Sequence, residues 1–298
     1  FTEETGVTVV VQDGGDAGTM LNQAILTKDN PIADVIFGVD NTFLSRAIEE
    51  GIFITHEAAA ISTVSELIRV QDDLATPIDY GDVCINYDVD AFAELDVAPP
   101  TTLLDLIDDT YRDMLVVQDP ATSSPGLAFL LATIAAFPDG GELDWTDYWA
   151  ELFDNGVSVA SDWSTAYYEQ FTRAGGDRPL VVSYASSPPA EVLFNELDEA
   201  PTGVMTDGCF RQIEFAGVLN GTEHESTAKQ LVDFLLSVDV QEDIPLNMFV
   251  YPTNGDAELP EVFETHTTFP ERPVIMEPNT IAANREAWIE QWTAIARS

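Results

Sequence analysis

Basic residues are scarce in this chain, which has 298 residues but only 11 lysines and arginines, and only Lys28 and Lys229 are lysines. Against 53 acidic residues they leave a formal net charge of -42, so the chain has no basic face to offer to nucleic acid. The acidic residues spread over the whole length, and hydrophobic residues make up 45% of the chain. This apolar content predicts a folded protein despite the charge.

Cysteine and histidine are also rare, and their spacing matches no known type of metal or redox site. Cys84 and Cys209 are the only cysteines, neither lies in a Cys-x-x-Cys motif, and the three histidines stand apart from one another. We therefore expect no metal, no cofactor and no catalytic residue. Both cysteines lie in apolar, strand-like runs, and we interpret them as buried thiols, with a single disulfide between them as the alternative.

Long apolar runs are missing as well. None approaches the roughly 18 residues of a membrane-spanning helix, and no signal peptide is recognisable. The first residues have the pattern of a helix end, a stop at Gly6 and then a strand over residues 7–12. This pattern predicts that a first strand and most of a helix precede Phe1.

Apolar runs alternate with helical patterns along the chain, which predicts an α/β fold with largely parallel sheets. The length suggests two domains, yet no Pro- or Gly-rich linker divides them, so we expect strands at 77–88 and 208–216 to cross between two lobes. Residues 1–83 and 208–298 would form lobe 1 and residues 84–207 lobe 2, with a ligand cleft between them. Strands are expected at 7–12, 33–39, 84–87, 113–118, 180–184 and 213–219, and helices at 18–27, 42–50, 102–107, 126–137, 144–155, 163–173, 190–196, 226–237 and 281–296.

Residues 118–130 have the pattern of a binding loop. A strand leads through small hydroxyl residues into a helix, for which we expect Ser124 as the N-cap and Pro125 as the first helical residue. Free backbone N–H groups, hydroxyls and the positive end of the helix dipole meet there, which suits an anionic or polar headgroup. An ordinary capped helix start is the alternative.

Eight stretches, spread over nearly the whole chain, carry a pattern in their order and spacing: 33–41, 79–81, 118–127, 163–167, 180–188, 212–214, 244–252 and 285–292. They resemble the thiamine-binding subfamily of ABC-transporter substrate-binding proteins. The resemblance implies a two-lobed type II periplasmic-binding-protein fold with a strand hinge, which captures thiamine or its phosphates outside the cytoplasm. It implies delivery to an ABC permease, a monomer without enzymatic activity, and a membrane anchor in a segment before Phe1.

The resemblance also assigns ligand contacts. Trp163, Tyr184 and Phe249 would enclose the thiazolium cation and the aminopyrimidine, while serines hold the hydroxyethyl or phosphate tail. An acidic contact falls on Asp16, and Asp13 is the competing register. The full predicted set is Asp16, Ala17, Ser123, Ser124, Trp163, Tyr184, Ala185, Ser186, Ser187, Pro188 and Phe249.

Two positions depart from the family pattern. Ala121 stands where an arginine commonly follows the Asp-Pro pair, which removes a cation that could bind a phosphate. A tyrosine expected shortly after Pro188 is replaced by Pro189 or Ala190. Both changes bear on the choice of ligand and not on the class of protein.

Three alternative functions stay open. A binding protein of the same fold would take a polyamine, which suits carboxylates and aromatics, or ferric ion, for which the adjacent Tyr167 and Tyr168 are candidates. An enzyme acting on thiamine or a pyrimidine would need a nucleophile beside a base, and Cys84 has no histidine near it in the matching motifs. A surface protein with a vestigial cleft would bind no small molecule tightly.

The scarcity of lysine and the distributed acidity suggest a halophilic protein. At about 1 M salt the Debye length falls to about 3 Å, so the self-repulsion of this surface is screened, whereas in dilute buffer it destabilises the fold. We expect a higher melting temperature in about 3 M than in about 0.1 M potassium chloride, measured by circular dichroism. Equal melting temperatures would contradict the halophilic interpretation.

Overall fold

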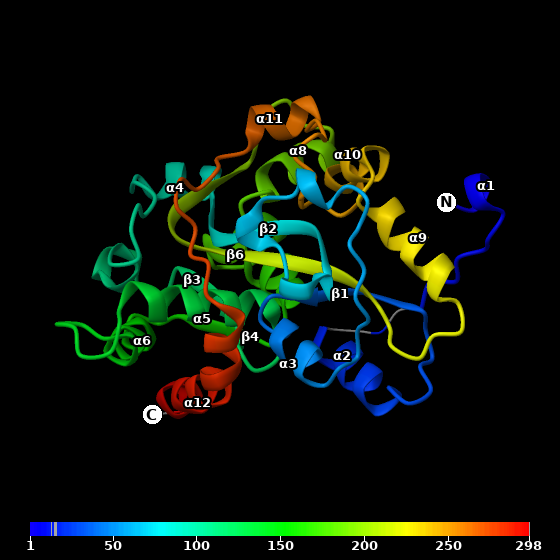
Figure 1. Cartoon of the computed structure of the whole chain (residues 1–298). Coiled ribbons are helices and arrows are strands. Elements are labelled where there is room, and N and C mark those ends of the chain that lie inside the picture. Colours follow the sequence, from blue (N-terminus) through cyan, green and yellow to red (C-terminus); the bar gives the residue numbers. More distant parts are fainter. Residues whose placement is uncertain (13, 15–16, 298) are drawn as a thin grey trace. The chain divides into compact units, whose positions relative to one another are not determined.

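The computed structural model describes residues 1–12, 14 and 17–297. The chain divides into two compact units, each built from two segments (Figure 1). Two long strands, β2 (Thr76–Asp88) and β6 (Thr202–Val218), belong in part to each unit. No helix in the described part of the chain is both long and apolar enough to cross a membrane. Unit 1 comprises Phe1–Tyr80 and Ile213–Pro260, and unit 2 comprises Gly81–Gln212 and Glu261–Ser298.

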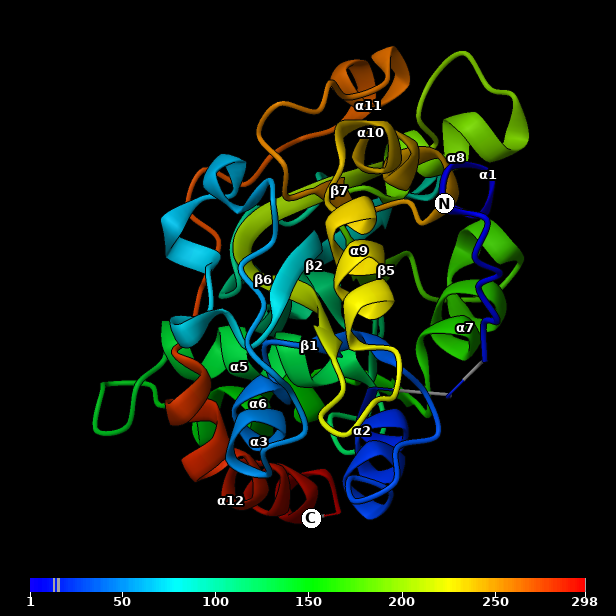
Figure 2. The same ribbon diagram turned by 45° about the vertical axis from the view of Figure 1, so that its right-hand side comes forward.

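In unit 1, β1 pairs antiparallel with β6, and β7 pairs antiparallel with β2. Side chains alternate on β6, so Ile213 and Phe215 pack with α2 and α3, whereas Ala216 and Val218 pack with α9 and α10. Figure 2 shows β6 and these helices of unit 1. One strand thus supplies two apolar clusters. The elements of unit 1 are α1 (Thr2–Thr5), α2 (Ala17–Leu26), β1 (Val35–Asp40), α3 (Leu44–Glu49), the 3₁₀ turns Ile61–Thr63, Glu66–Ile68 and Gln71–Asp73, α9 (Glu225–Leu235), α10 (Val238–Asn247) and β7 (Tyr251–Pro252).

In unit 2, β3 runs parallel to both β4 and β5, and β5 pairs antiparallel with β2. Leu115 and Val117 of β3 face the large core formed with α5 and α6, and Val116 between them faces the opposite apolar cluster. The elements of unit 2 are α4 (Val89–Leu95), the 3₁₀ turns Asp105–Ile107, Asp109–Tyr111 and Thr172–Ala174, β3 (Leu115–Gln118), α5 (Ser124–Ala136), α6 (Trp145–Asp154), β4 (Ser158–Ala160), α7 (Trp163–Thr165), the π turn Ala166–Gln170, β5 (Leu180–Tyr184), α8 (Ser187–Asn195), α11 (Glu261–His266) and α12 (Pro278–Ala296).

The C-terminal helix α12 packs against α6 in unit 2 (Figure 1). The indole of Trp292 meets that of Trp149 edge to face, with ring centroids 5.5 Å apart. The predicted division placed residues 208–298 together with residues 1–83, and the structure differs from it in the last part of the chain. In the sequence, a long loop precedes α12 and the helix has an apolar face, so it could pack in either unit. Its contact with the aromatic side chains of α6 places it in unit 2.

Two further predictions need correction. The sheet is not largely parallel: β3 pairs in parallel with β4 and β5, whereas β1 with β6, β2 with β5 and β2 with β7 pair antiparallel. Buried strands of either direction give similar apolar runs in a sequence. Residues 7–12, all of them described, form no strand, and the side chains of Val10 and Val11 are 78% and 89% exposed. An apolar, β-branched run forms a strand only when a neighbouring strand supplies its hydrogen bonds.

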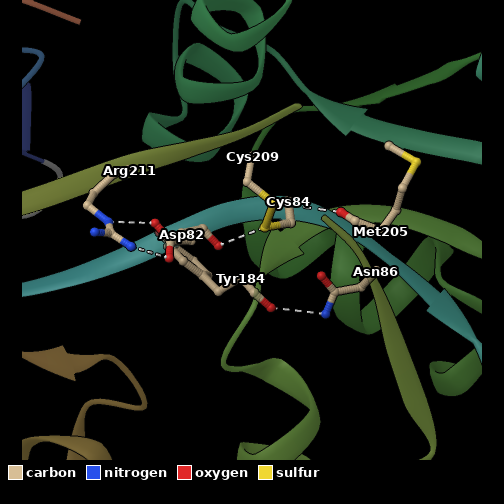
Figure 3. The surroundings of a disulfide bond; sticks show 7 residues. All are labelled: Asp82, Cys84, Asn86, Tyr184, Met205, Cys209 and Arg211. Carbon is tan, nitrogen blue, oxygen red and sulfur yellow. Dashed lines mark hydrogen bonds and ion pairs between the residues drawn. A yellow bond between two sulfur atoms is a disulfide. The ribbon is translucent and has the colours of Figure 1, made fainter. Parts of the chain in front are cut away.

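A disulfide links Cys84 on β2 to Cys209 on β6, so the interpretation of the two residues as buried thiols is wrong and the alternative holds (Figure 3). Beside it, Arg211 donates through Nε and Nη2 to the two carboxylate oxygens of Asp82, both at 2.8 Å. The Asp82 side chain is fully buried, so this two-point pairing supplies the counter-charge that burial requires. A covalent bond and an ion pair therefore hold β2 and β6 together within unit 2.

We expect the double variant Cys84→Ala/Cys209→Ala to be less stable than the parent by about 2 to 5 kcal/mol, because a bond between distant residues restricts the unfolded chain. The two cysteines are 125 residues apart, which places the loss toward the upper part of this range. Urea unfolding followed by circular dichroism measures it. Dithiothreitol should lower the midpoint of the parent and leave the double variant unchanged, and a parent insensitive to reduction would contradict the prediction.

Candidate functional site

Three loops of unit 2 begin at the same edge of its sheet. They follow β3, β4 and β5, whose carboxyl ends lie together because the strands are parallel. The Asp119 N–H donates to the Ala160 carbonyl at 2.9 Å, and the Thr122 hydroxyl donates to the Ser161 carbonyl at 2.7 Å, so the first two loops are bound to each other. These loops and the helix starts after them hold eight of the predicted contacts, namely Ser123, Ser124, Trp163, Tyr184, Ala185, Ser186, Ser187 and Pro188.

The first loop ends in a capped helix. Ser123, not Ser124, is the N-cap of α5: its backbone is extended, and its hydroxyl accepts from the Gly126 N–H at 3.4 Å. Ser124 is therefore the first helical residue, which corrects the predicted start by one position. A Cβ at position 126 would lie 2.5 Å from the Gln118 carbonyl oxygen, so only glycine allows α5 to begin this close to β3.

The third loop has the same Ser-Ser-Pro sequence at the start of α8. Ser186 is the N-cap, and Ser187 and Pro188 open the helix, but the Ser186 backbone is helical and its side chain makes no capping hydrogen bond. The Ser186 hydroxyl is buried and has no hydrogen-bond partner among the described residues. Two helix N-termini that follow neighbouring parallel strands thus bring backbone N–H groups and hydroxyls to one edge, which suits a polar or anionic group.

Trp163 is the aromatic residue of the second loop and is half buried. Its indole Nε1–H donates to the Ser183 hydroxyl at 3.0 Å, and its ring stacks on that of Tyr167 with centroids 4.9 Å apart and an interplanar angle of 19°. The orientation of the indole is therefore set from two sides. An aromatic wall with this orientation could stack on a flat or cationic ligand.

Tyr184, at the end of β5, lies next to the disulfide (Figure 3). Its carbonyl accepts from the Asn86 side chain at 3.1 Å, and its hydroxyl donates to the Gln212 side-chain oxygen at 3.4 Å. Ala185 is completely buried against the disulfide, and its N–H donates to the Asp82 carbonyl at 2.8 Å. Ala185 thus offers no exposed side chain, and Tyr184 is the side chain of this strand end that could face a ligand.

The other predicted contacts lie elsewhere in the chain. Ala17 begins α2, and Phe249 follows α10, both in unit 1. Phe249 has a φ of 58°, an uncommon backbone conformation for a residue with a bulky side chain, and one that clusters at functional sites. Asp16 and its alternative Asp13 lie outside the described residues.

The adjacent tyrosines do not form a tyrosinate pair. Tyr167 is buried and its hydroxyl donates to the Glu191 carboxylate, whereas Tyr168 is 61% exposed. Burial, and then the Glu191 charge, raise the pKa of Tyr167 well above its usual range, which disfavours the anion that ferric ion needs. Among the described residues, no group of three or more His, Cys, Asp and Glu side chains could hold a metal ion.

Several buried polar residues around these loops are not predicted from the sequence. Gln118 ends β3, its amide donates to the Val182 carbonyl at 2.9 Å, and its buried Oε1 has no hydrogen-bond partner among the described residues. Ser183 and Glu191 bond to Trp163 and Tyr167, respectively. A serine inside an apolar strand and a glutamate on a short helix have no distinctive pattern, so only their contacts reveal them.

Unit 1 contains a buried acidic residue of its own. Asp79 on β2 is 1% exposed, and one of its carboxylate oxygens has no hydrogen-bond partner among the described residues. Burial raises the pKa of Asp79 well above its usual value, and the negative charge of Glu214 raises it further. Asp79 therefore favours its neutral, protonated form in the folded protein.

Comparison with known proteins places this geometry in a family. Residues 30–270 match the model of the bacterial extracellular solute-binding protein family. The thiamine-binding periplasmic protein of Escherichia coli K12 is 30% identical over 277 residues, which cover 93% of this chain and 80% of that protein. The corresponding protein of Brucella suis is 27% identical and covers 99% of this chain and 84% of its own length.

Solved structures that resemble this chain are periplasmic binding proteins as well. A periplasmic thiamin-binding protein superposes with a TM-score of 0.81 at 29% identity, over 94% of this chain and 84% of its own. The ferric-binding protein of Campylobacter jejuni superposes with a TM-score of 0.78 at 17% identity, over 99% of this chain and 93% of its own. At this low identity the superposition supports the fold alone. The predicted α/β fold of the type II periplasmic-binding-protein kind and the resemblance to thiamine-binding proteins are thereby confirmed.

We expect Asp79→Asn to make the protein more stable than the parent at and above neutral pH. Because the folded-state pKa of Asp79 is raised, the proton it binds stabilises the fold at low pH, and this contribution is lost as the pH rises through that pKa. Asparagine cannot ionise, so the variant should lose less stability as the pH rises. Urea midpoints over a series of pH values measure the difference.

Glu214→Gln is the matched control for this prediction. It removes the neighbouring charge and leaves Asp79 in place, so it should lower the raised pKa only in part, because burial is the larger cause. Identical pH profiles for the parent and Asp79→Asn would contradict the prediction.

Proposed function

The chain belongs to the family of bacterial extracellular solute-binding proteins, and we propose that its solute is thiamine, which it delivers to an ABC permease. It is a binding protein and not an enzyme. One observation carries the proposal: similarity to proteins named for thiamine binding extends over nearly the whole chain. In addition, eight of the expected contacts lie at one edge of the sheet in unit 2.

The chemistry of these loops suits the three parts of thiamine. The indole of Trp163 offers a face to the permanently cationic thiazolium, and a cation over an indole is the strongest contact of its kind. Tyr184 can contact the aminopyrimidine through its ring and its hydroxyl. The helix starts at Ser123 and Ser186 offer hydroxyls and N–H groups to the hydroxyethyl tail.

The first loop favours thiamine over its phosphates. Ala121 provides no cation at the position where the family resemblance leads us to expect arginine, and its N–H donates to the Asp119 carboxylate at 2.8 Å. A carboxylate in this loop opposes the approach of a phosphate, while the two helix N-termini attract it. We therefore propose a preference for the unphosphorylated tail and not an exclusion of phosphates.

The family description and the names of the relatives support a location outside the cytoplasm. The disulfide between Cys84 and Cys209 agrees with this, because disulfides persist in oxidising compartments. A membrane anchor, the permease partner, the monomeric state and adaptation to high salt stay predictions.

Calorimetric titration with thiamine, thiamine monophosphate and spermidine tests the proposal, in a buffer of about 2 to 3 M salt so that surface repulsion is screened. Sub-micromolar binding of thiamine, weaker for the monophosphate, is the expected result. No heat with thiamine and a clear signal with spermidine would leave the fold intact and replace the ligand by a polyamine.

Trp163→Ala should weaken thiamine binding by roughly 10- to 100-fold, because a desolvated cation–π contact is worth about 1.5 to 3 kcal/mol. Trp163→Phe, which keeps an aromatic face and loses the indole donor, should lie between this variant and the parent. Calorimetry gives the affinities, and thermal melts check that both variants fold. An unchanged affinity in Trp163→Ala would make this residue a part of the core.

A further inference from the structure

Trp163 is held from two sides. Its ring stacks on that of Tyr167, with centroids 4.9 Å apart. The indole N–H donates to the Ser183 hydroxyl at 3.0 Å, and Ser183 pairs with the Ser187 hydroxyl at 2.9 Å. The indole therefore cannot turn without losing the stacked ring or the hydrogen bond.

Tyr167 is itself anchored through Glu191, which forms an ion pair. The Tyr167 hydroxyl donates to Oε1 of Glu191, and Oε2 of Glu191 lies 3.5 Å from Nε of Arg173. The Glu191 side chain is only 13% exposed and that of Arg173 is 29% exposed, so the charges are partly shielded from water. A hydrogen bond to an ionised acceptor is stronger than one between neutral groups, which makes Glu191 an effective anchor for the phenol.

We infer that Tyr167 and Glu191 are positioning residues of the thiamine site, which hold the Trp163 indole in its ligand-binding orientation before thiamine arrives. The inference rests on the proposed function only for the identity of the ligand. Immobilising a side chain in advance spares the entropy that binding would otherwise cost, an effect of about 2- to 10-fold in affinity for one such residue.

The serines near the third loop differ in their contacts. The hydroxyls of Ser183 and Ser187 pair with each other at 2.9 Å, and Ser183 also accepts from the indole N–H of Trp163. The hydroxyl of Ser186, the N-cap of α8, is buried and has no hydrogen-bond partner among the described residues. Ser186 thus keeps its whole hydrogen-bonding capacity for the ligand, whereas Ser187 helps to hold Ser183 against Trp163.

Hydrogen exchange of the Trp163 indole N–H tests the inference in ligand-free protein, by NMR of ¹⁵N-labelled indoles with the resonance assigned from Trp163→Phe. Tyr167→Phe keeps the stacked ring and removes the hydroxyl, and Glu191→Ala removes the anchor. Both should speed exchange by about 10-fold or more. Glu191→Gln keeps an acceptor oxygen of the same reach and should restore much of the protection, even if Glu191→Ala does not fold.

Tyr168→Phe is the matched control, because the ring beside Trp163 is retained and the hydroxyl lost belongs to an exposed side chain. It should leave both exchange and affinity unchanged. Parent-like exchange in Tyr167→Phe overturns the inference, as does equal acceleration in the Tyr168→Phe control, which would indicate a general loosening of this turn.

Thiamine titration provides the second readout. Tyr167→Phe should bind thiamine about 2- to 10-fold more weakly than the parent. A parent that binds no thiamine would refute the proposed function, while the exchange data would still decide whether Tyr167 and Glu191 position the indole. Faster exchange with unchanged thiamine affinity would overturn the claim that this positioning serves binding.

Discussion

The bond between β2 and β6 is the constraint on which the organisation of unit 2 depends. Cys84 and Cys209 join the two strands covalently, and the Asp82–Arg211 ion pair lies two residues away on each. β5 pairs with β2, and β3 pairs with β5, so the rest of the sheet is built outward from this bond. Ala185 packs on the disulfide itself, which fixes the point where the third loop of the site begins.

Strand direction then decides which residues meet. Because β3, β4 and β5 are parallel, their carboxyl ends share an edge, and every loop that leaves this edge brings its small polar residues to the same place. Two of these loops start helices with Ser-Ser-Pro, and the loop between them supplies an indole. Hydroxyls, backbone N–H groups and an aromatic face therefore converge without any one stretch of sequence containing them all.

Two of the few cations of this acidic chain pair with acids that are buried. Arg211 pairs with the fully buried Asp82, and Arg173 with the mostly buried Glu191. A buried carboxylate without a partner would be far more costly than an exposed one, so a scarce guanidinium has its greatest effect there. Asp79 needs no counter-charge, because its raised pKa favours the neutral, protonated acid. Burial, more than the overall charge, thus determines which acidic groups require a counter-charge.

The sequence by itself determined the α/β class, most helices, and the Ser-Ser-Pro helix start at residues 123–125, because these depend on periodicity and on neighbours a few residues away. It also held enough of the family pattern to identify the class of ligand and to predict ligand contacts, eight of which lie at one edge of the sheet of unit 2. Only the tertiary structure decided the antiparallel pairings, the disulfide between cysteines 125 residues apart, the packing of α12 in unit 2, and the hydrogen bonds from Trp163 to Ser183 and from Tyr167 to Glu191. Each of these joins segments far apart in the chain, and which distant partners meet is set by the packing of the whole unit and leaves no local pattern to read.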